Sequence, residues 1–252
     1  MMQQRSRLIV PKSGRVNKNF ACRRVAAGYN IFATMDIITL TPESPDYPSE
    51  FRTIGDDMPP VLYALGYTEL LKHPHKVAII GGRQADSNGT EAAYRLGHKY
   101  AEEGWVVVSG LAAGCDTAAH RGCLDAGGKT IAIVATGLDR VHPKENIALQ
   151  EDILRSGGLI LSEQPLGTKA NPTRLIARTR LQAALANPIV VAQCAERSGT
   201  MHTVAFAQKY GKHLLAVHYD YLTEHTAGNR LLIENGIAET ISIPPMQQIL
   251  LH

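Results

Sequence analysis

At 252 residues, the chain is long enough for one large α/β domain with a small appendage, and its 44% hydrophobic and 19% charged residues are ordinary for a globular protein. Its longest apolar runs fall far short of the roughly 18 residues that a membrane span needs, which excludes a membrane protein. The formal net charge of +3 comes from residues 1–35, which hold seven basic and no acidic side chains. The rest of the chain has 19 basic and 23 acidic residues.

Residues 1–35 lack clear periodicity and are expected to form a disordered basic extension. They could instead be an arm that touches nucleic acid, a weak targeting signal, or an upstream extension if translation starts at Met35 rather than Met1. The rest of the chain carries a net charge of −4, so a polyanion would have to be bound by a local basic cluster.

The cysteines lie in or beside apolar runs and show no CxxC spacing. They are Cys22, Cys115, Cys123 and Cys194. This pattern favours reduced thiols in a cytoplasmic protein and disfavours a metal site.

Residues 36–70 are rich in proline, which breaks helices and favours extended segments. We expect them to form an N-terminal segment packed on the core, with residues 61–63 as a short edge strand. Residues 71–252 are expected to form a Rossmann-like core domain.

From residue 76 onward, short apolar runs alternate with segments of helical character. Apolar runs of about four residues bounded by glycine are typical of strands buried on both faces of a parallel sheet. The expected strands are 77–80, 105–108, 130–135, 159–162, 188–192 and 213–217. The expected helices are 90–103, 116–126 (with Asp116 as N-cap), 147–155, 173–186, 198–210 and 229–235, and residues 241–251 form a last turn or strand. The alternation predicts an α/β fold with a Rossmann-like, doubly wound, mostly parallel sheet.

Two glycine-bearing loops follow the first two of these strands directly. Loops at neighbouring strand ends bring backbone N–H groups and helix N-termini to one crevice, which is a site for phosphate. The candidate residues are Gly81, Gly82 and Arg83 in the first loop and Ser109, Gly110 and Gly114 in the second. The alternative for the first loop is a plain turn with a surface arginine. Asp116 and His120, one helical turn apart, are expected to support the site rather than catalyse.

A basic cluster spans the loop and helix after the fourth strand, with no acidic residue between Glu163 and Glu196. Arginines stacked on one helix face repel each other unless an anion joins them, so an anionic partner is expected, the alternative being a solvated cationic face. The cluster comprises Lys169, Arg174, Arg178 and Arg180, with Lys144 on the same rim. A third helix start, Ser198-Gly199-Thr200, offers N–H groups and hydroxyls to an anion or simply caps its helix.

Several catalytic and cofactor motifs are absent from the sequence. There is no G-x-S-x-G elbow, no HExxH, no EF-hand loop, no Walker-type phosphate loop and no G-x-G-x-x-G fingerprint. We therefore expect neither catalytic residues nor a bound cofactor or metal.

Residues 47–249 resemble the DNA-processing protein A family, DprA, also called Smf, through VAIIGGR, VVVSGLAAGCDTAAH, RTRLQAALA and SGTMHTVAFAQKYGKHLLAV. The resemblance implies a Rossmann-like core that binds single-stranded DNA in natural transformation, protects it, loads RecA and dimerises, here without the winged-helix domain of many members. It places Arg83 at a phosphate contact, and Arg178 and Arg180 in the family's arginine element. Some positions differ from the family pattern, namely Gly82, Cys115, His142, Leu175, Ile176 and Thr179.

A non-enzymatic single-stranded DNA binder is thus the leading hypothesis. The first rival is a nucleoside-monophosphate phosphoribohydrolase of the related lysine-decarboxylase-like fold, but Thr203 stands where the resemblance would place the catalytic glutamate. The second rival is a small-nucleotide sensor that uses the same crevice.

Overall fold

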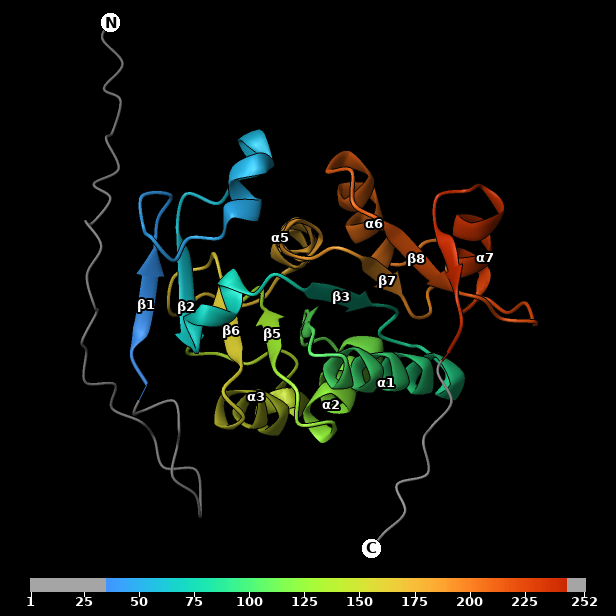
Figure 1. Ribbon diagram of the computed structural model, residues 1–252, viewed down its shortest axis with the longest axis horizontal. Helices are drawn as coiled ribbons and strands as arrows, with labels where there is room; N and C mark the ends of the chain where they lie inside the picture. Colours follow the sequence, from blue (N-terminus) through green and yellow to red (C-terminus); the bar gives the residue numbers. More distant parts are fainter. Residues whose placement is uncertain (1–34, 244–252) are drawn as a thin grey trace, which may run out of the picture.

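The computed structural model describes residues 35–243 as a single nine-stranded sheet with helices on both faces (Figure 1). The strand order is β1-β2-β6-β5-β4-β3-β7-β8-β9. β1 and β2 pair antiparallel to their neighbours and the other strands are parallel. The strands are β1 Ile37–Leu40, β2 Leu62–Gly66, β3 Lys76–Ile80, β4 Val106–Ser109, β5 Thr130–Ile133, β6 Leu159–Ser162, β7 Ile189–Val191, β8 Leu214–Val217 and β9 Glu239–Ile241. The predicted α/β class with a mostly parallel, doubly wound sheet is confirmed.

The helices form a layer on each face of this sheet. Side chains of α5, α6 and α7 share one apolar cluster, and those of α1, α2 and α3 pack on the opposite face. The helices are α1 Ser87–Glu102, α2 Cys115–Asp125, α3 Ile147–Arg155, α4 Pro172–Ala177, α5 Thr179–Leu185, α6 Thr200–Lys209 and α7 Ala227–Glu234. Short 3-10 turns are η2 Ser49–Thr53, η3 Gly55–Asp57, η4 Thr68–Lys72 and η5 Lys144–Asn146. Within residues 35–243, no helix has both the length and the apolar character needed to cross a membrane.

The six predicted parallel strands are each present within two residues of the expected bounds. The predicted edge strand at 61–63 is β2, and the prediction that it lies at the edge was wrong, because β1 pairs on its outer side. β9 was expected slightly later in the chain. The predictions for residues 1–34 and for 244–252 lie outside the described residues.

Two helix predictions need correction. The helix expected over 173–186 is divided at Arg178 into α4 and α5, at the residue whose side chain is held by the ends of β4 and β5. The N-cap of α2 is Gly114 rather than Asp116. Asp116 instead lies in the first helical turn, from which its carboxylate reaches back into the preceding loop.

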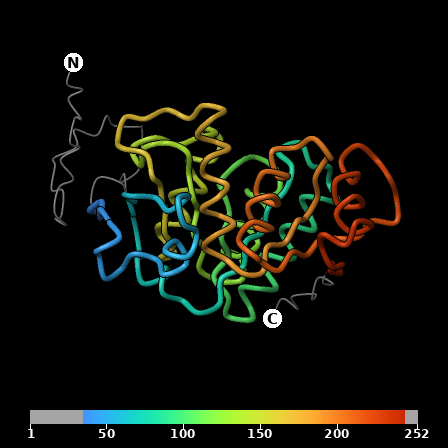
Figure 2. Tube along the Cα trace, turned by 90° about the horizontal axis from the view of Figure 1, so that it is seen from above, coloured from blue at the N-terminus to red at the C-terminus, as the bar shows by residue number. Residues whose placement is uncertain are grey.

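The N-terminal segment contacts the core through charged groups as well as through β2. Lys76, which is almost completely buried, pairs with Glu50 at 2.6 Å. Asp57 accepts hydrogen bonds of 2.6 Å from Lys209, at the end of α6, and from the hydroxyl of the next residue, Tyr210. Figure 2 shows this segment at one end of the molecule and α7 at the other, with the centre of the sheet between them.

Candidate functional site

A cavity of about 680 Å³ lies where the order of the parallel strands reverses. From β3, the chain adds β4, β5 and β6 on one side and later β7, β8 and β9 on the other. The loops after β3 and β7 therefore leave toward opposite faces, and a crevice opens between them at the carboxyl ends of the strands. Its walls are residues 80–85, residues 193–203 and parts of α4 and α5.

A second cavity of about 240 Å³ adjoins the first. The two share Arg83, Ala112, Leu175 and Arg178 as wall residues. The second continues toward His142 and Pro143 after β5 and toward Ala170 before α4. The two cavities thus lie side by side along the carboxyl edge of β7, β3, β4 and β5, and we call them together the carboxyl-edge groove.

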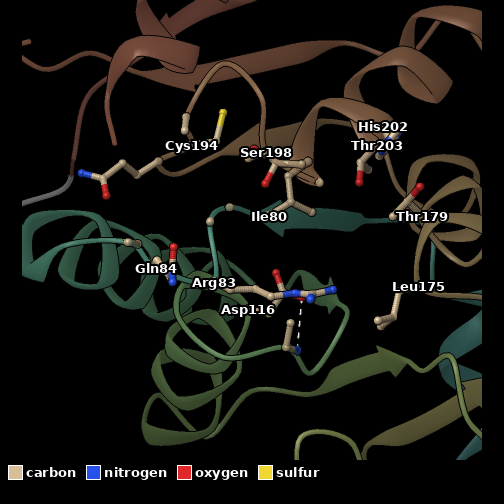
Figure 3. A pocket seen from close by; sticks show the side chains of 18 of the residues that line it. Ile80, Arg83, Gln84, Asp116, Leu175, Thr179, Cys194, Ser198, His202 and Thr203 are labelled. Carbon is tan, nitrogen blue, oxygen red and sulfur yellow. Dashed lines mark hydrogen bonds between the residues drawn. The ribbon is translucent and has the colours of Figure 1, made fainter. Parts of the chain in front are cut away.

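Arg83 stands where the two cavities meet. Its side chain is exposed and makes no ion pair or hydrogen bond with any residue in 35–243. Figure 3 shows Arg83 and Asp116 on one wall, facing Ser198, His202 and Thr203 on the other. Arg83 is therefore available to an anion, as the sequence led us to expect.

The two glycines before Arg83 line the larger cavity, but they also make close contacts within the protein. The amide of Gly82 donates to the carbonyl of Gln193 at 2.7 Å, so it is not available to a phosphate. A Cβ on Gly81 would lie 2.4 Å from the Cys115 sulfur, so only glycine fits between β3 and α2. These glycines allow the loops after β3, β4 and β7 to pack closely.

The amides of the loop after β4 donate hydrogen bonds to a carboxylate of the same protein, that of Asp116. Asp116 accepts hydrogen bonds from the amides of Gly110 at 3.2 Å and Ala112 at 3.3 Å. Ser109 donates its hydroxyl to the carbonyl of Ile79 at 2.7 Å and is fully buried. The expectation that Ser109 and Gly110 face a phosphate is therefore corrected, because the hydroxyl of Ser109 donates to a carbonyl and the N–H of Gly110 donates to an internal carboxylate. Phosphate contact at Gly114 stays a prediction.

Arg178 completes this internal arrangement. Its guanidinium donates to the carbonyls of Gly110 and, at 2.6 Å, Ile133, and lies 3.7 Å from the carboxylate of Asp116. The side chain is only 5% exposed, and burial lowers the pKa of Arg178, whereas Asp116 acts in the opposite direction. Burial likewise raises the pKa of Asp116, against the effects of Arg178 and the two amides. Arg178 thus ties the ends of β4 and β5 to α2 while forming part of the groove wall.

Gly114 connects the two glycine loops and has a positive φ of 75°. A Cβ there would lie 2.3 Å from the carbonyl oxygen of Gly82. We predict that Gly114→Ala lowers the free energy of unfolding by at least about 1–3 kcal/mol, since it adds backbone strain and a clash. Gly104→Ala is the control, because Gly104 has a φ of 78° and open space around it. Equal losses for the two variants in urea unfolding would contradict the prediction.

The other predicted arginines do not reach the groove. Arg180 donates to Glu163 at 2.9 Å and to the carbonyl of Asp57 at 2.9 Å, and it lines neither cavity. Arg174 donates to Gln164 and to the carbonyl of Lys169, both at 3.1 Å. The expectation that three arginines converge is thus corrected, because Glu163 after β6 and Asp116 on α2 already supply the anions.

Lys144 and Lys169 are exposed and lie next to the walls of the second cavity. Each adjoins a wall residue in the chain, Pro143 for Lys144 and Ala170 for Lys169. Neither lysine lines a cavity, so their place at the rim of the carboxyl-edge groove stays a prediction.

Ser198, Gly199 and Thr200 line the larger cavity at the start of α6, with Gly199 as the N-cap. The hydroxyl oxygen of Ser198 is buried and has no hydrogen-bond partner in residues 35–243. Sequence reasoning missed Arg197, His202 and Gln182, which also line this cavity. Arg197 is exposed and unpaired among the described residues, and its position directly before Ser198 was a signal that could have revealed it.

His120 lies away from both cavities. It is fully buried, and its Nδ1 is 2.7 Å from the hydroxyl of Thr130. Burial lowers the pKa of His120 to about 3, so the ring is neutral at physiological pH. No group of three His, Cys, Asp or Glu side chains in residues 35–243 is arranged to hold a metal ion.

Comparison with known proteins points to one family. The family model described as DNA recombination-mediator protein A matches residues 38–250. Protein Smf of Synechocystis sp. is 36% identical over 205 residues, which make up 80% of this chain and 51% of that protein. The chain therefore spans about half the length of this curated relative.

Two solved structures are similar over most of their length. The X-ray structure of DNA processing protein A (DprA) from Streptococcus pneumoniae has a TM-score of 0.75 and 34% identity, and the match covers 83% of this chain and 72% of that one. DNA processing protein A from Helicobacter pylori, described as having a unique single-stranded DNA binding mode, has a TM-score of 0.73 and 34% identity, with coverage of 81% and 90%.

Proposed function

The chain belongs to the DNA recombination-mediator protein A family, and from this membership we propose that it binds single-stranded DNA during DNA uptake in natural transformation. In this role it protects the incoming strand and promotes the loading of RecA. Binding takes place in the carboxyl-edge groove and involves no catalysis.

The observation that carries this proposal is the adjacency of the two cavities, which share Arg83 as a wall residue. Two cavities meet at Arg83, so a ligand that fills both must be long and must carry negative charge where they join. Further exposed cations lie at Arg197 in the larger cavity and at Lys144 and Lys169 beside the smaller one. A sugar–phosphate chain has this length and this spacing of charge.

The wall of α4 supplies apolar contact. Leu175 lines both cavities, and Ile176, which is 41% exposed, lines the larger one. No Phe, Tyr or Trp side chain of residues 35–243 lines either cavity, so stacking on these rings contributes less than backbone and apolar contacts.

Binding to a single-stranded oligonucleotide is predicted to weaken steeply with salt. Four phosphate contacts by Arg83, Arg197, Lys144 and Lys169 correspond to a slope of log K against log salt of about −3, or roughly fifty-fold between 50 and 200 mM. Fluorescence anisotropy across a salt series measures this slope, with a duplex of the same sequence as the comparison. A slope near zero, or no binding at low salt, would count against the proposal.

The rival enzymatic hypothesis lacks the glutamate on which its chemistry depends. Thr203 lines the larger cavity where a phosphoribohydrolase would need its glutamate, and Asp116 is engaged by Arg178 and two amides. Release of free base from a panel of nucleoside monophosphates tests this alternative. Thermal shifts with mononucleotides and with oligonucleotides separate a small-nucleotide sensor from a strand binder.

RecA loading, dimerisation and a cytoplasmic location are proposed from family membership. The three cysteines in the described residues are free and buried, which agrees with a reducing compartment. Sedimentation of the full chain tests dimerisation. Displacement of a single-strand-binding protein by RecA, with and without this chain, tests loading.

A further inference from the structure

Asp57, in the 3-10 turn η3 of the N-terminal segment, contacts two helices that line the larger cavity. Its carboxylate oxygen Oδ2 accepts hydrogen bonds of 2.6 Å from Lys209, at the end of α6, and from the hydroxyl of the next residue, Tyr210. Its main-chain carbonyl accepts a hydrogen bond of 2.9 Å from the Nε of Arg180 on α5. Asp57 therefore joins α5 to the end of α6.

Arg180 extends this contact to α4 and β6. Its guanidinium also donates to the carbonyl of Ala177, the last residue of α4, and to the carboxylate of Glu163 after β6, both at 2.9 Å. The side chains of Arg180 and Glu163 are 15% and 13% exposed, so salt screens this pair less than a surface pair. We call the connected residues the Asp57 network: Asp57, Glu163, Arg180, Lys209 and Tyr210.

The donors around Asp57 keep its charge fixed at neutral pH. Hydrogen bonds from Lys209 and Tyr210 hold the pKa of the Asp57 carboxyl below its ordinary value. Burial, together with the carboxylate of Asp57, raises the pKa of Tyr210, so its hydroxyl keeps the proton that it donates. The carboxylate of Asp57 is thus a lasting acceptor between these two side chains.

The Asp57 network lies outside the groove, yet its helices form a wall of the larger cavity. None of its five residues lines either cavity, whereas Leu175 on α4, Thr179 on α5 and Thr203 on α6 line the larger one. Figure 1 shows α5 between the N-terminal segment and α6. The network holds the last residues of α6 and the cavity is lined by the first ones, which are separated by about 15 Å of helix.

The N-terminal segment does not need Asp57 in order to stay packed on the core. Phe51 and Tyr47 are buried in the apolar cluster that includes α5, and Glu50 pairs with the buried Lys76. Anchoring of the segment therefore leaves the contacts of Asp57 unexplained. What these contacts add is a fixed position of three helices relative to one another, and close-packed helices transmit such a constraint along their length.

We propose that Asp57 is a positioning residue for strand binding, which sets the wall of the larger cavity by joining α5 to the end of α6 and which touches no ligand itself. This inference rests on the proposed function, because it assigns to the N-terminal segment control over the groove in which the strand is bound.

Asp57→Asn tests this role, since it keeps the shape of the side chain and removes the charge that Lys209 pairs with. At a temperature where the chain is fully folded, the variant is expected to bind a single-stranded oligonucleotide about threefold to tenfold more weakly than the parent. Loss of an acidic charge by itself acts in the opposite direction, because it reduces repulsion of a polyanion. Anisotropy titration measures the affinity, and circular dichroism in urea checks the folded fraction.

Asp56→Asn is the matched control. Asp56 is the preceding residue, is exposed, and makes no hydrogen bond or ion pair with another side chain in residues 35–243. This variant removes the same charge and is expected to bind at least as tightly as the parent. Tyr210→Phe removes only the hydroxyl that donates to Asp57, and it is expected to weaken binding in the same direction as Asp57→Asn. It also carries the test should Asp57→Asn fail to fold.

The salt dependence separates positioning from phosphate contact. A variant that loses one phosphate contact, as expected for Arg83→Ala, loses about 0.7 to 1 from the slope of log K against log salt. Asp57→Asn is expected to keep the slope of the parent while its affinity is lower at every salt concentration.

Hydrogen exchange of the free chain gives a readout that needs no DNA. Peptides that cover α4 and the first half of α6 are expected to exchange at least about threefold faster in Asp57→Asn and Tyr210→Phe than in the parent. These peptides should exchange at the parental rate in Asp56→Asn, and peptides of α1 and α3 should do so in all variants. A role confined to local anchoring would change only the peptides that contain the network.

The outcomes separate the positioning role from the proposed function. Strand binding by the parent that is equally strong in Asp57→Asn and Tyr210→Phe overturns the positioning role alone, as does a reduced salt slope in Asp57→Asn. Unchanged exchange of α4 and α6 in both variants also overturns it. If the parent binds no oligonucleotide, the proposed function is removed, and faster exchange of α4 and α6 still supports control of the cavity wall by Asp57.

Discussion

Arg178→Ala is expected to lower the free energy of unfolding by about 3–5 kcal/mol, because it leaves a buried carboxylate without its counter-charge. The guanidinium of Arg178 also holds the carbonyls of Gly110 and Ile133, which lose their donors in the variant. Asp116 would keep only the amides of Gly110 and Ala112 as partners in a site shielded from water.

Urea unfolding followed by circular dichroism measures this effect. Arg155→Ala is the control, since Arg155 is about half exposed and pairs with Glu151 and Asp152 on the surface of α3, where such pairs contribute at most about 1 kcal/mol. The double variant Asp116→Asn with Arg178→Met removes both charges and is expected to lose less stability than Arg178→Ala alone. A loss below about 1 kcal/mol for Arg178→Ala would show that the pair does not organise these loops.

Arg83→Ala is expected to weaken binding of a single-stranded oligonucleotide by at least about tenfold, which corresponds to the loss of one charge-assisted hydrogen bond. Arg83 lies at the junction of the two cavities, so its loss affects contacts along the whole groove. Its side chain is exposed and unpaired within residues 35–243, so the stability of the fold should be unchanged.

Anisotropy titration at low salt measures this change, with Arg155→Ala as the control for a lost surface arginine. Arg83→Lys keeps the charge but loses the bidentate geometry, and is expected to bind with intermediate affinity. Affinities of Arg83→Ala and the parent that agree within about threefold at low salt would exclude Arg83 as a main phosphate contact.

Arg83 and Arg178 were both predicted from the sequence to contact phosphate, but the structure gives them different surroundings. Arg83 and Arg178 both line the groove, yet one is free for a ligand and the other is already held by protein. Binding assays on Arg178 variants must therefore be corrected for the folded fraction, because lost affinity there reports lost structure as well as lost contact.

The sequence by itself determined the layered fold. The apolar runs at β3, β4, β5, β6, β7 and β8 are each bounded by glycine or polar residues, and strands buried on both faces require such runs. It also indicated that the loops after β3 and β4 would lie side by side, because neighbouring parallel strands end at the same edge of the sheet. β1 was not predicted and β9 was expected slightly later in the chain, because short edge strands are only partly buried and lack a strong pattern.

Only the tertiary structure decided which charges are free. Arg180 is 17 residues from Glu163 and Arg178 is 62 residues from Asp116, and no local pattern records that these side chains meet. The same holds for Gly82, whose amide donates to a carbonyl on a distant loop, and for Gln182, whose burial beside the larger cavity depends on how α5 packs beside α6. Backbone periodicity reports burial along one element, whereas the partner of a polar group depends on where the other elements lie.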